Sequence, residues 1–536
     1  GTRNVEALKL NCFIERQSPY RFTALDFKEL RNLRYLRVDY ADLDGDFTGI
    51  GRFTDIRSIK FPDEIGNLEK LEEMDASFRS DLHGEIPSSI GGLSSLRILR
   101  LDFTNIYSLP TSICGLSRLE TLDLLCCDKL QLLPDELPSS LTSLHVTCQS
   151  METFPSRLSN LINLKKLVFE SCVNLVEITR DIRKLSQLET LSLKYCDKLR
   201  TLPVEIGAIS RLKELQLLSC GNLQCILALP PSLFKIGVQY CRSLERLPDL
   251  SNLKNLSYLT LTQLDKLREI PELGELEYLY IARCKSLKRL PDLSNLKKLR
   301  RINISDCELE LVLSGKLELL MSLDISDCES LKRLDVSNLG MLKDLKLYGC
   351  QKLVEIEGLG VLKSLKTLDV SGCTSLERLD LSSLKNLEEL KILHCKNLTE
   401  IQGLEELKSL RFLNVAGCKL IEKLPDLSNL KKLKILIAFF CEKLTEIRGL
   451  EELKSLKLLD ISGCKSIERL PDFSDTMIDT DSYMAKKWEA EGWDGWLEEW
   501  LGGEPEEWFG WESEEWEDEK DRWIRELFSE LQCANQ

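Results

Sequence analysis

The stretch that decides the fold is LKTLDVSGCTSL, residues 365–376. Its spacing is L-x-x-L-x-[LVI]-x-x-C-x-x-[LI], and the same spacing occurs five times, with small variations, between Leu365 and Ile467. The alternation of apolar and polar residues at its centre is typical of a short strand with one apolar face. One such unit cannot bury its apolar edge alone, so the sequence predicts a stack of units that share one continuous core.

The period of the pattern identifies the kind of stack. From Leu119 onward the units follow one another every 20 to 24 residues. A unit of about 20 to 29 residues with this apolar spacing is the signature of a leucine-rich repeat solenoid. We therefore predict an α/β leucine-rich repeat solenoid, a horseshoe of about 20 repeats with a parallel sheet on its concave face.

The linkers between the strands predict the convex side. Prolines at residues 135–140 and 229–232 disfavour helix, whereas residues 251–255 and 405–408 could each hold one helical turn. Gly358, Gly403 and Gly449 recur 45 and 46 residues apart within near-identical double units. Each of these glycines is expected at a turn that requires a positive φ.

Cysteine marks the position directly after most strands. Fourteen of the 20 cysteines share the slot of Cys373 in the repeat, so their position and not pairing explains them. A buried thiol packs as a small apolar residue and offers a weak S–H donor, which predicts a ladder of reduced thiols. Parallel side chains point the wrong way for disulfides, and there is no paired C-x-x-C motif at zinc-finger spacing, so no metal site is predicted. Other residues fill the slot in some units, namely Ala41, Arg79, Thr104, Gln149 and Leu264.

Composition divides the chain into three parts: an N-terminal cap (residues 1–32), the repeats (33–473) and an acidic tail (474–536). The formal charge is -15, and from Asp475 onward there are 20 acidic and 5 basic residues, which leaves 67 of each before it. All eight tryptophans lie between Trp488 and Trp523, at largely helical spacing. We expect a short helical tail that either caps the open end of the core or docks another domain or protein.

Charge and hydropathy exclude two classes of partner. The repeats are neutral overall and the tail is acidic, so neither part has the basic surface of a nucleic-acid binder. The longest apolar run, Ile435 to Cys441, is far shorter than the roughly 20 residues of a membrane span. The first ten residues carry charges and no apolar signal segment, so we expect a soluble intracellular protein.

Chemistry-bearing motifs point to binding and not to catalysis. The three histidines, His83, His145 and His394, have no recognisable nucleophile motif beside them, and there is no phosphate-cradling G-x-x-x-x-G-K-[ST] loop. The outward strand positions instead hold Tyr, Phe and Arg, which are enriched at protein interfaces. Aromatic residues favour strands anyway, so a single one needs no function. As a set, the predicted partner-binding residues are Tyr240, Tyr258, Tyr278, Tyr280, Arg283, Tyr348, His394, Phe412, Phe439 and Phe440, with Phe412, Phe439 and Phe440 as the best single patch.

Three features together resemble a known family. The opening GTRNVEAL (residues 1–8), the segment FKELRNLRYLRV (27–38) and the units L-x-x-L-x-L-x-x-C-x-x-L-x-x-[LI]-P are similar to the segment that follows the nucleotide-binding module of plant TIR-type nucleotide-binding leucine-rich repeat (TIR-NB-LRR) disease-resistance proteins. The resemblance covers residues 1 to about 473. The β-sandwich that often follows the repeats in that family has no counterpart in the Trp-rich tail.

The resemblance implies a function and a cell compartment. Such repeats recognise a pathogen effector and hold the receptor inactive without it, in the cytoplasm and possibly the nucleus. The implied partners are the effector and the receptor's own nucleotide-binding module. In such relatives a TIR domain cleaves NAD and the nucleotide-binding module binds ADP or ATP. Neither is in this chain, so no cofactor is expected here.

Two other readings stay open. A ubiquitin-ligase adaptor or substrate receptor can be built on similar repeats, and an F-box-like helix bundle before Gly1, in place of a P-loop module, would decide for it. An enzyme that uses a thiol outside the ladder is the third reading. Its candidate thiols are Cys12, Cys114, Cys225 and Cys533.

Overall fold

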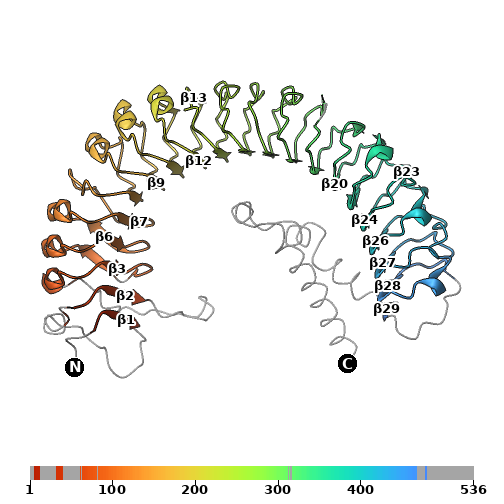
Figure 1. The fold of residues 1–536 in the computed structure, drawn as a ribbon, viewed down its shortest axis with the longest axis horizontal. Coiled ribbons are helices and arrows are strands. Elements are labelled where there is room, and N and C mark those ends of the chain that lie inside the picture. Colours follow the sequence, from red (N-terminus) through yellow and green to blue (C-terminus); the bar gives the residue numbers. More distant parts are fainter. Residues whose placement is uncertain are drawn as a thin grey trace.

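The structure of the chain is a computed structural model with one solenoid (Figure 1). It describes residues 5–11, 30, 32–39, 61, 63–80, 82–311, 313, 315, 317–467 and 477–479. The strands line the inner side of an arc, and loops with short helical turns form its outer side. This arrangement confirms the predicted leucine-rich repeat horseshoe.

Among the described residues, one parallel sheet of 21 strands follows the concave side. Each strand pairs with the next one of the sheet along the chain, as in β16 with β17 and β17 with β18. Its strands, in chain order, are β1 (Ala7–Asn11), β2 (Tyr35–Asp39), β3 (Glu73–Asp75), β5 (Ile98–Arg100), β7 (Thr121–Leu124), β8 (Ser143–Val146), β9 (Lys166–Glu170), β10 (Thr190–Lys194), β12 (Glu214–Leu218), β14 (Lys235–Gln239), β15 (Tyr258–Thr262), β16 (Tyr278–Ala282), β17 (Arg301–Ser305), β18 (Ser322–Ser326), β20 (Asp344–Lys346), β22 (Thr367–Asp369), β24 (Glu389–Lys391), β26 (Phe412–Asn414), β27 (Ile435–Ile437), β28 (Leu458–Asp460) and β29 (Met477–Asp479).

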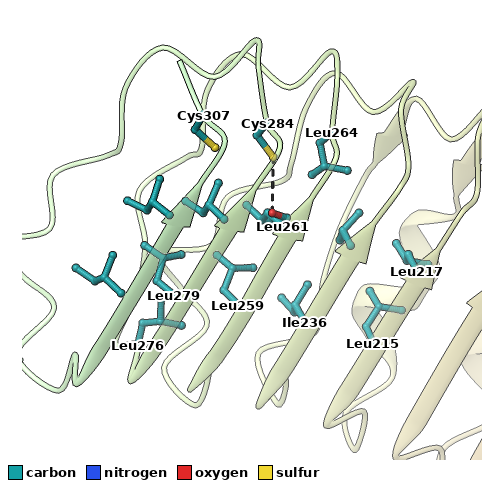
Figure 2. Close-up of a cluster of buried hydrophobic side chains, with 14 of the residues drawn as sticks. Leu215, Leu217, Ile236, Leu259, Leu261, Leu264, Leu276, Leu279, Cys284 and Cys307 are labelled. Atoms are coloured by element: carbon teal, nitrogen blue, oxygen red, sulfur yellow. Dashed lines mark hydrogen bonds between the residues drawn. The ribbon is translucent and has the colours of Figure 1, made fainter. Parts of the chain in front are cut away.

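The strands pair without a shift, so equivalent positions of the repeat stand side by side. Leu259 pairs with Leu279, and Leu279 pairs with Ile302. These leucines and isoleucines point away from the concave face into the main core, which is continuous from Leu30 to Ile461. Figure 2 shows this packing from Leu215 to Leu279, with no break between repeats. The stack therefore supplies the burial that no unit could supply alone.

The convex side holds short strands and 3-10 turns. In the part of the chain that the structure describes, four two-stranded pairs lie there, β4 (His83–Glu85) with β6 (Asn105–Ser108), β11 (Thr201–Leu202) with β13 (Cys225–Ile226), β19 (Arg333–Asp335) with β21 (Glu355–Glu357), and β23 (Arg378–Asp380) with β25 (Glu400–Gln402). The 3-10 turns are η3 (Asp63–Asn67), η4 (Ser88–Gly92), η5 (Thr111–Gly115), η6 (Ser156–Asn160), η7 (Arg180–Lys184), η8 (Val204–Ala208), η9 (Leu359–Val361), η10 (Leu404–Glu406) and η11 (Leu450–Glu452). The expected turn near residues 405–408 is therefore present, whereas residues 251–255 form no helix.

Local sequence explains where the 3-10 turns begin. Pro87, Pro110, Pro155 and Pro203 precede η4, η5, η6 and η8, where an N–H would have no partner in the turn. Gly358, Gly403 and Gly449 precede η9, η10 and η11 with φ values of 82°, 74° and 78°. The prediction of a positive φ at these glycines is confirmed.

The cysteine slot closes the core next to the strand ends. Cys284 is buried, and its Sγ lies 3.6 Å from the carbonyl oxygen of Leu261 in the preceding repeat, as the dashed line in Figure 2 shows. The equivalent contact is 3.7 Å from Cys328 to Ile304, 3.1 Å from Cys373 to Leu347 and 2.8 Å from Cys418 to Ile392. A thiol thus donates to a carbonyl of the strand one repeat earlier.

The tail was predicted to be helical and to occupy residues 474–536. Within that range only β29 belongs to the described residues, and the Trp-rich part lies outside them. β29 pairs with β28, with Met477 beside Leu458. The sheet therefore continues to Asp479.

Candidate functional site

The concave face is organised in three columns. Each strand offers two outward side chains around its central core residue and a third one after the next core residue, and the unshifted pairing aligns them from repeat to repeat. Tyr258 of β15, Tyr278 of β16 and Arg301 of β17 are neighbours in the first column. A chemical group repeated at one position of the unit therefore becomes a continuous stripe.

Aromatic rings and one cation form such a stripe in the middle of the arc. The rings of Tyr258 and Tyr278 stack with centroids 4.5 Å apart and planes 3° from parallel. Phe234 meets Tyr258 edge-on at 5.2 Å, and the guanidinium carbon of Arg301 lies 5.9 Å from the Tyr278 ring centroid. We call Phe234, Tyr258, Tyr278 and Arg301 the aromatic ladder. It offers a partly exposed π surface that ends in a positive charge, which suits aromatic and acidic groups of a partner.

The phenol of Tyr280 stands beside the aromatic ladder in the middle column. It pairs in register with Thr260 on one side and Asn303 on the other. Burial raises the pKa of Tyr280, and a hydrogen bond with Ser305 opposes that shift. Burial also raises the pKa of Tyr258. Both phenols therefore stay protonated near neutral pH.

Four of the predicted residues lie at the strand exit and not in the three columns. Tyr240, Arg283, His394 and Phe440 each stand directly before the cysteine slot, with φ values of 56°, 54°, 53° and 53°. The left-handed backbone at this position ends the strand, so strict alternation no longer tells which way the side chain points.

The predicted phenylalanine patch is largely closed. Phe439 is 1% exposed and packs edge-on against Phe440, with ring centroids 5.7 Å apart. Phe412 is only partly buried and packs against the same cluster, which is separate from the main core. Tyr348, also predicted, is partly exposed in the third column after β20. The ten predicted residues thus fall into a group on β14 to β16, a group around β27 and isolated positions between them.

Sequence reasoning missed the two ends of the aromatic ladder. Phe234 precedes β14, outside the strand alternation, and Arg301 carries no ring. The available signal was the position of Arg301, which occupies the same place in the unit as Tyr278 one repeat earlier. A second stack was also missed at the N-terminal rim, where Phe78 and Phe103 lie 4.6 Å apart and are 60% and 45% exposed.

A row of alternating charge follows in the middle column. Asp324, Lys346, Asp369 and Lys391 stand on neighbouring strands in register. Burial raises the pKa of Asp324, and the adjacent Lys346 partly offsets that shift. Burial lowers the pKa of Lys391, against the pull of Asp369. This row is polar and self-complementary, in contrast to the aromatic ladder.

A hydrogen-bonded chain of serine, histidine and aspartate lies on β7 and β8. The Nδ1 atom of His145 is 2.9 Å from Asp123 Oδ2, and its Nε2 atom is 3.2 Å from the hydroxyl of Ser143. Nucleophilic catalysis also needs N–H groups aimed at a developing oxyanion. The amides of Ser143 and Thr147 already donate to Glu120 and Leu124 of the neighbouring strand. The chain of hydrogen bonds therefore reads as support for the sheet surface.

Comparisons with known protein families agree with this repeat geometry. Two family models match the chain, one described as "Leucine-rich repeat region" over residues 79–290 and one as "BspA type Leucine rich repeat region (6 copies)" over residues 325–445 and 371–486. None of the helices among the described residues is long and apolar enough to cross a membrane. The chain is a leucine-rich repeat protein.

Named relatives point to one group of leucine-rich repeat proteins. The chain is 42% identical over 96 residues to the TMV resistance protein N of Nicotiana glutinosa, which is 18% of this chain and 8% of that protein. It is 34% identical over 106 residues to the disease resistance protein RPS6 of Arabidopsis thaliana, 20% of this chain and 9% of that one. The chain is thus similar to leucine-rich repeat segments of plant disease-resistance proteins, and these matches span less than a tenth of each of the two relatives.

A likeness to solved structures concerns the fold alone. The structure of the Arabidopsis receptor kinase HAESA, in complex with the peptide hormone IDA and the co-receptor SERK1, is 20% identical. It covers 86% of this chain and 83% of that chain, with a TM-score of 0.40. The peptide hormone and the co-receptor are partners of HAESA, and the likeness assigns no ligand to this chain.

Proposed function

We propose that this chain is the sensor of an intracellular plant immune receptor and that it binds a pathogen effector on its concave face. The observation that carries the proposal is the aromatic ladder, whose stacked rings and terminal Arg301 interrupt an otherwise mostly polar sheet. Tyr and Arg supply most of the binding energy at many protein interfaces. The relatives among plant disease-resistance proteins support the same role.

The second part of the proposal is autoinhibition. Without effector, the repeats hold the receptor inactive by packing against its nucleotide-binding module, which would bind ADP or ATP. The chain would act in the cytoplasm or nucleus, where that module can meet both nucleotide and effector. Effector binding at the aromatic ladder and release of the nucleotide-binding module are then thermodynamically coupled.

The test uses the full-length receptor in leaves that also express candidate effectors. We expect Tyr258→Ala combined with Arg301→Glu to abolish effector-dependent cell death without raising background cell death. Loss of one central Tyr or Arg contact costs about 2 kcal/mol or more of binding free energy, which weakens the affinity by about 30-fold or more. Lys166→Ala, in the same column on β9, is the matched control because it is exposed and far along the sheet.

Two results contradict the proposal. One is an unchanged response of the double variant to every effector that activates the unmodified receptor. The other is stable co-purification with ubiquitin-ligase subunits without any immune response, which would favour the adaptor reading. Protein levels and thermal unfolding of the variants are compared first, since a misfolded receptor also fails to respond.

A further inference from the structure

The edge of the sheet at which the strands start is strongly basic in the last repeats. Because the strands are parallel, they all start along one edge, and each is preceded by the pattern L-x-x-L-x or a close variant of it. In the six repeats of β20, β22, β24, β26, β27 and β28, the x positions of this pattern hold 11 basic residues and one acidic residue, Glu388. We call these 11 basic residues, which begin with Lys343 and end with Lys457, the basic edge.

The excess of positive charge is confined to this part of the solenoid. In the twelve preceding repeats, from β3 to β18, the same positions hold 10 basic and 7 acidic residues. On the opposite edge of the last six repeats, the x positions of C-x-x-[LI]-x hold 5 basic and 4 acidic residues. The basic edge is therefore a local feature that the neutral total charge of the repeats conceals.

The backbone holds one row of the basic edge in place. The N–H of Lys457 donates to the carbonyl oxygen of Lys434, and the N–H of Lys434 donates to that of Arg411, both at 2.8 Å. The same hydrogen bond links the equivalent residues back to Lys343. Side chains of the row thus start from neighbouring strands, about 4.8 Å apart. Like charges at that spacing repel one another, and the backbone does not let them separate.

Carboxylates of the solenoid neutralise only a small part of the basic edge. The Nζ atom of Lys366 lies 3.4 Å from one carboxylate oxygen of Glu388, and Nε of Arg411 lies 3.7 Å from the other. The Nζ atom of Lys431 lies 2.8 Å from Glu452 Oε2. Within the described part of the chain, the other eight residues of the basic edge make no ion pair, and seven of them are exposed. Most of this charge therefore faces solvent.

We propose that the basic edge is a docking surface for an acidic segment of a partner protein. A row of uncompensated cations is complementary to a chain of carboxylates, which would relieve the repulsion within the row. All but one of the 11 residues are lysines, whose compact ammonium groups can each pair with one carboxylate. The partner is thus defined by its Asp and Glu content.

The composition of the basic edge disfavours two other anionic partners. None of the x positions in these six repeats is aromatic, whereas surfaces that bind single-stranded nucleic acid add rings on which the bases stack. Glu388 and Glu452 lie among the basic side chains and would repel a continuous anionic membrane surface. A protein segment can set neutral or basic side chains of its own beside these two carboxylates.

The basic edge is separate from the aromatic ladder. Figure 1 shows β20 to β28 in the last part of the arc, whereas the aromatic ladder lies on β15 to β17 and directly before β14. A partner at the basic edge would approach the starts of the strands and not the middle of the concave face. Binding at the two surfaces can therefore be lost independently, and the basic edge does not depend on the function proposed for the aromatic ladder.

The test uses the full chain and a fluorescein-labelled peptide of alternating Glu and Gly residues, with binding read by fluorescence anisotropy. We expect Lys434→Gln combined with Lys454→Gln to weaken binding by about 5- to 25-fold, since each exposed ion pair contributes up to a factor of about 5. Lys165→Gln combined with Lys254→Gln is the matched control. These two lysines are exposed, occupy the same two positions of the pattern on β9 and β15, and change the net charge equally. The control pair should leave the affinity unchanged within about 2-fold.

Further measurements separate specific docking from general attraction. High ionic strength should abolish binding to the unmodified chain, and a peptide with Gln in place of Glu should not bind. Circular dichroism and thermal unfolding establish that the exposed substitutions leave the solenoid folded.

Three results overturn the proposal. The first is no binding of the Glu peptide to the unmodified chain at low ionic strength. The second is equal weakening by the two pairs of substitutions, which would assign the binding to net charge alone. The third is tighter binding of single-stranded RNA or of phosphatidylserine vesicles with the same dependence on Lys434 and Lys454, which would assign the basic edge to another class of partner.

Discussion

The imidazole of His394 lies across Gly417 of the next repeat. A Cβ atom built on Gly417 would come closer than 3.0 Å to His394 Nδ1, a separation that real Cβ atoms do not show. Both residues stand directly before the cysteine slot, with φ values of 53° and 68°. Phe440 has the same relation to Gly463. A bulky residue at this position in one repeat thus rests on a glycine in the following one.

The first prediction concerns that contact. Gly417→Ala should lower the free energy of unfolding by about 2 kcal/mol or more, since a left-handed φ costs a non-glycine residue about 1–2 kcal/mol and the imidazole must also move. The control is Gly340→Ala, because a Cβ on Gly340 meets nothing within 4 Å. Urea unfolding compares the two variants. Equal midpoints for the two variants would show that neither the left-handed φ nor the His394 ring restricts position 417 to glycine.

The second prediction concerns the pH dependence of stability. Burial, then Lys396 and Lys419, lower the pKa of His394 to about 4. In the unfolded chain the pKa of a histidine is about 6.5, so the unfolded chain binds the proton more readily than the folded one. The stability that the fold has with a neutral His394 is therefore lost as the pH falls from about 6.5 towards 4. The loss should be on the order of 1–2 kcal/mol once solvent screening of a partly exposed ring is allowed for.

The matching variant is His394→Gln, which cannot titrate. Its unfolding midpoint should fall less steeply over the same pH interval than that of the unmodified chain. Parallel pH profiles for the two proteins would assign the acid sensitivity to other groups, such as Glu120, whose carboxyl pKa is lowered by its hydrogen bond with Arg97. Each midpoint is measured by urea titration at constant ionic strength.

The strand-exit position also shows where sequence reasoning ends. The apolar periodicity predicted the strands, the shared core and the fold, because Leu365, Leu368 and Val370 can be buried together in only one way. The same alternation assigned Tyr240, Arg283 and His394 to the concave row, although a positive φ turns the backbone there. The glycines at 349, 372, 417 and 463, each directly before a cysteine, were the available signal for that turn.

Contacts between repeats were harder to predict than the repeats themselves. Tyr258 and Tyr278 were both expected on the concave face, but their stacking depends on equal strand register across the 20-residue spacing between them. Arg301 joins them only because its repeat keeps that register too. Burial of Phe439 could not be expected, since the outward direction of its side chain is all that the periodicity provides.

The third prediction tests the strain at the strand exit in the opposite direction. Ser219 has a φ of 53° where four later repeats use glycine. Ser219→Gly should raise the free energy of unfolding by about 0.5 kcal/mol, because relief of the left-handed strain slightly exceeds the entropy that glycine adds to the unfolded chain. Calorimetry should show a small rise in Tm. A lower Tm would mean that the Ser219 side chain contributes a contact worth more than the strain.

The fourth prediction concerns the packing of the thiol ladder. Cys373 is fully buried, and its Sγ lies 3.1 Å from the carbonyl oxygen of Leu347. Cys373→Ala removes that donor and leaves a small cavity, so the free energy of unfolding should fall by about 1–3 kcal/mol. Cys114→Ala is the control, because Cys114 is an exposed thiol on η5. Similar losses for both variants would contradict a structural role that depends on the slot.

The fifth prediction concerns thiol reactivity. Burial raises the pKa of Cys284 to about 12 and that of Cys307 to about 11, so neither forms the reactive thiolate near neutral pH. Brief treatment of the native protein with iodoacetamide should therefore modify Cys114 and leave Cys284 and Cys307 unmodified, as read by mass spectrometry of peptides. Unfolding in urea should make all three react at similar rates. Native labelling of Cys284 as fast as Cys114 would show that the repeats open locally around β15 and β16, against the continuous core seen there.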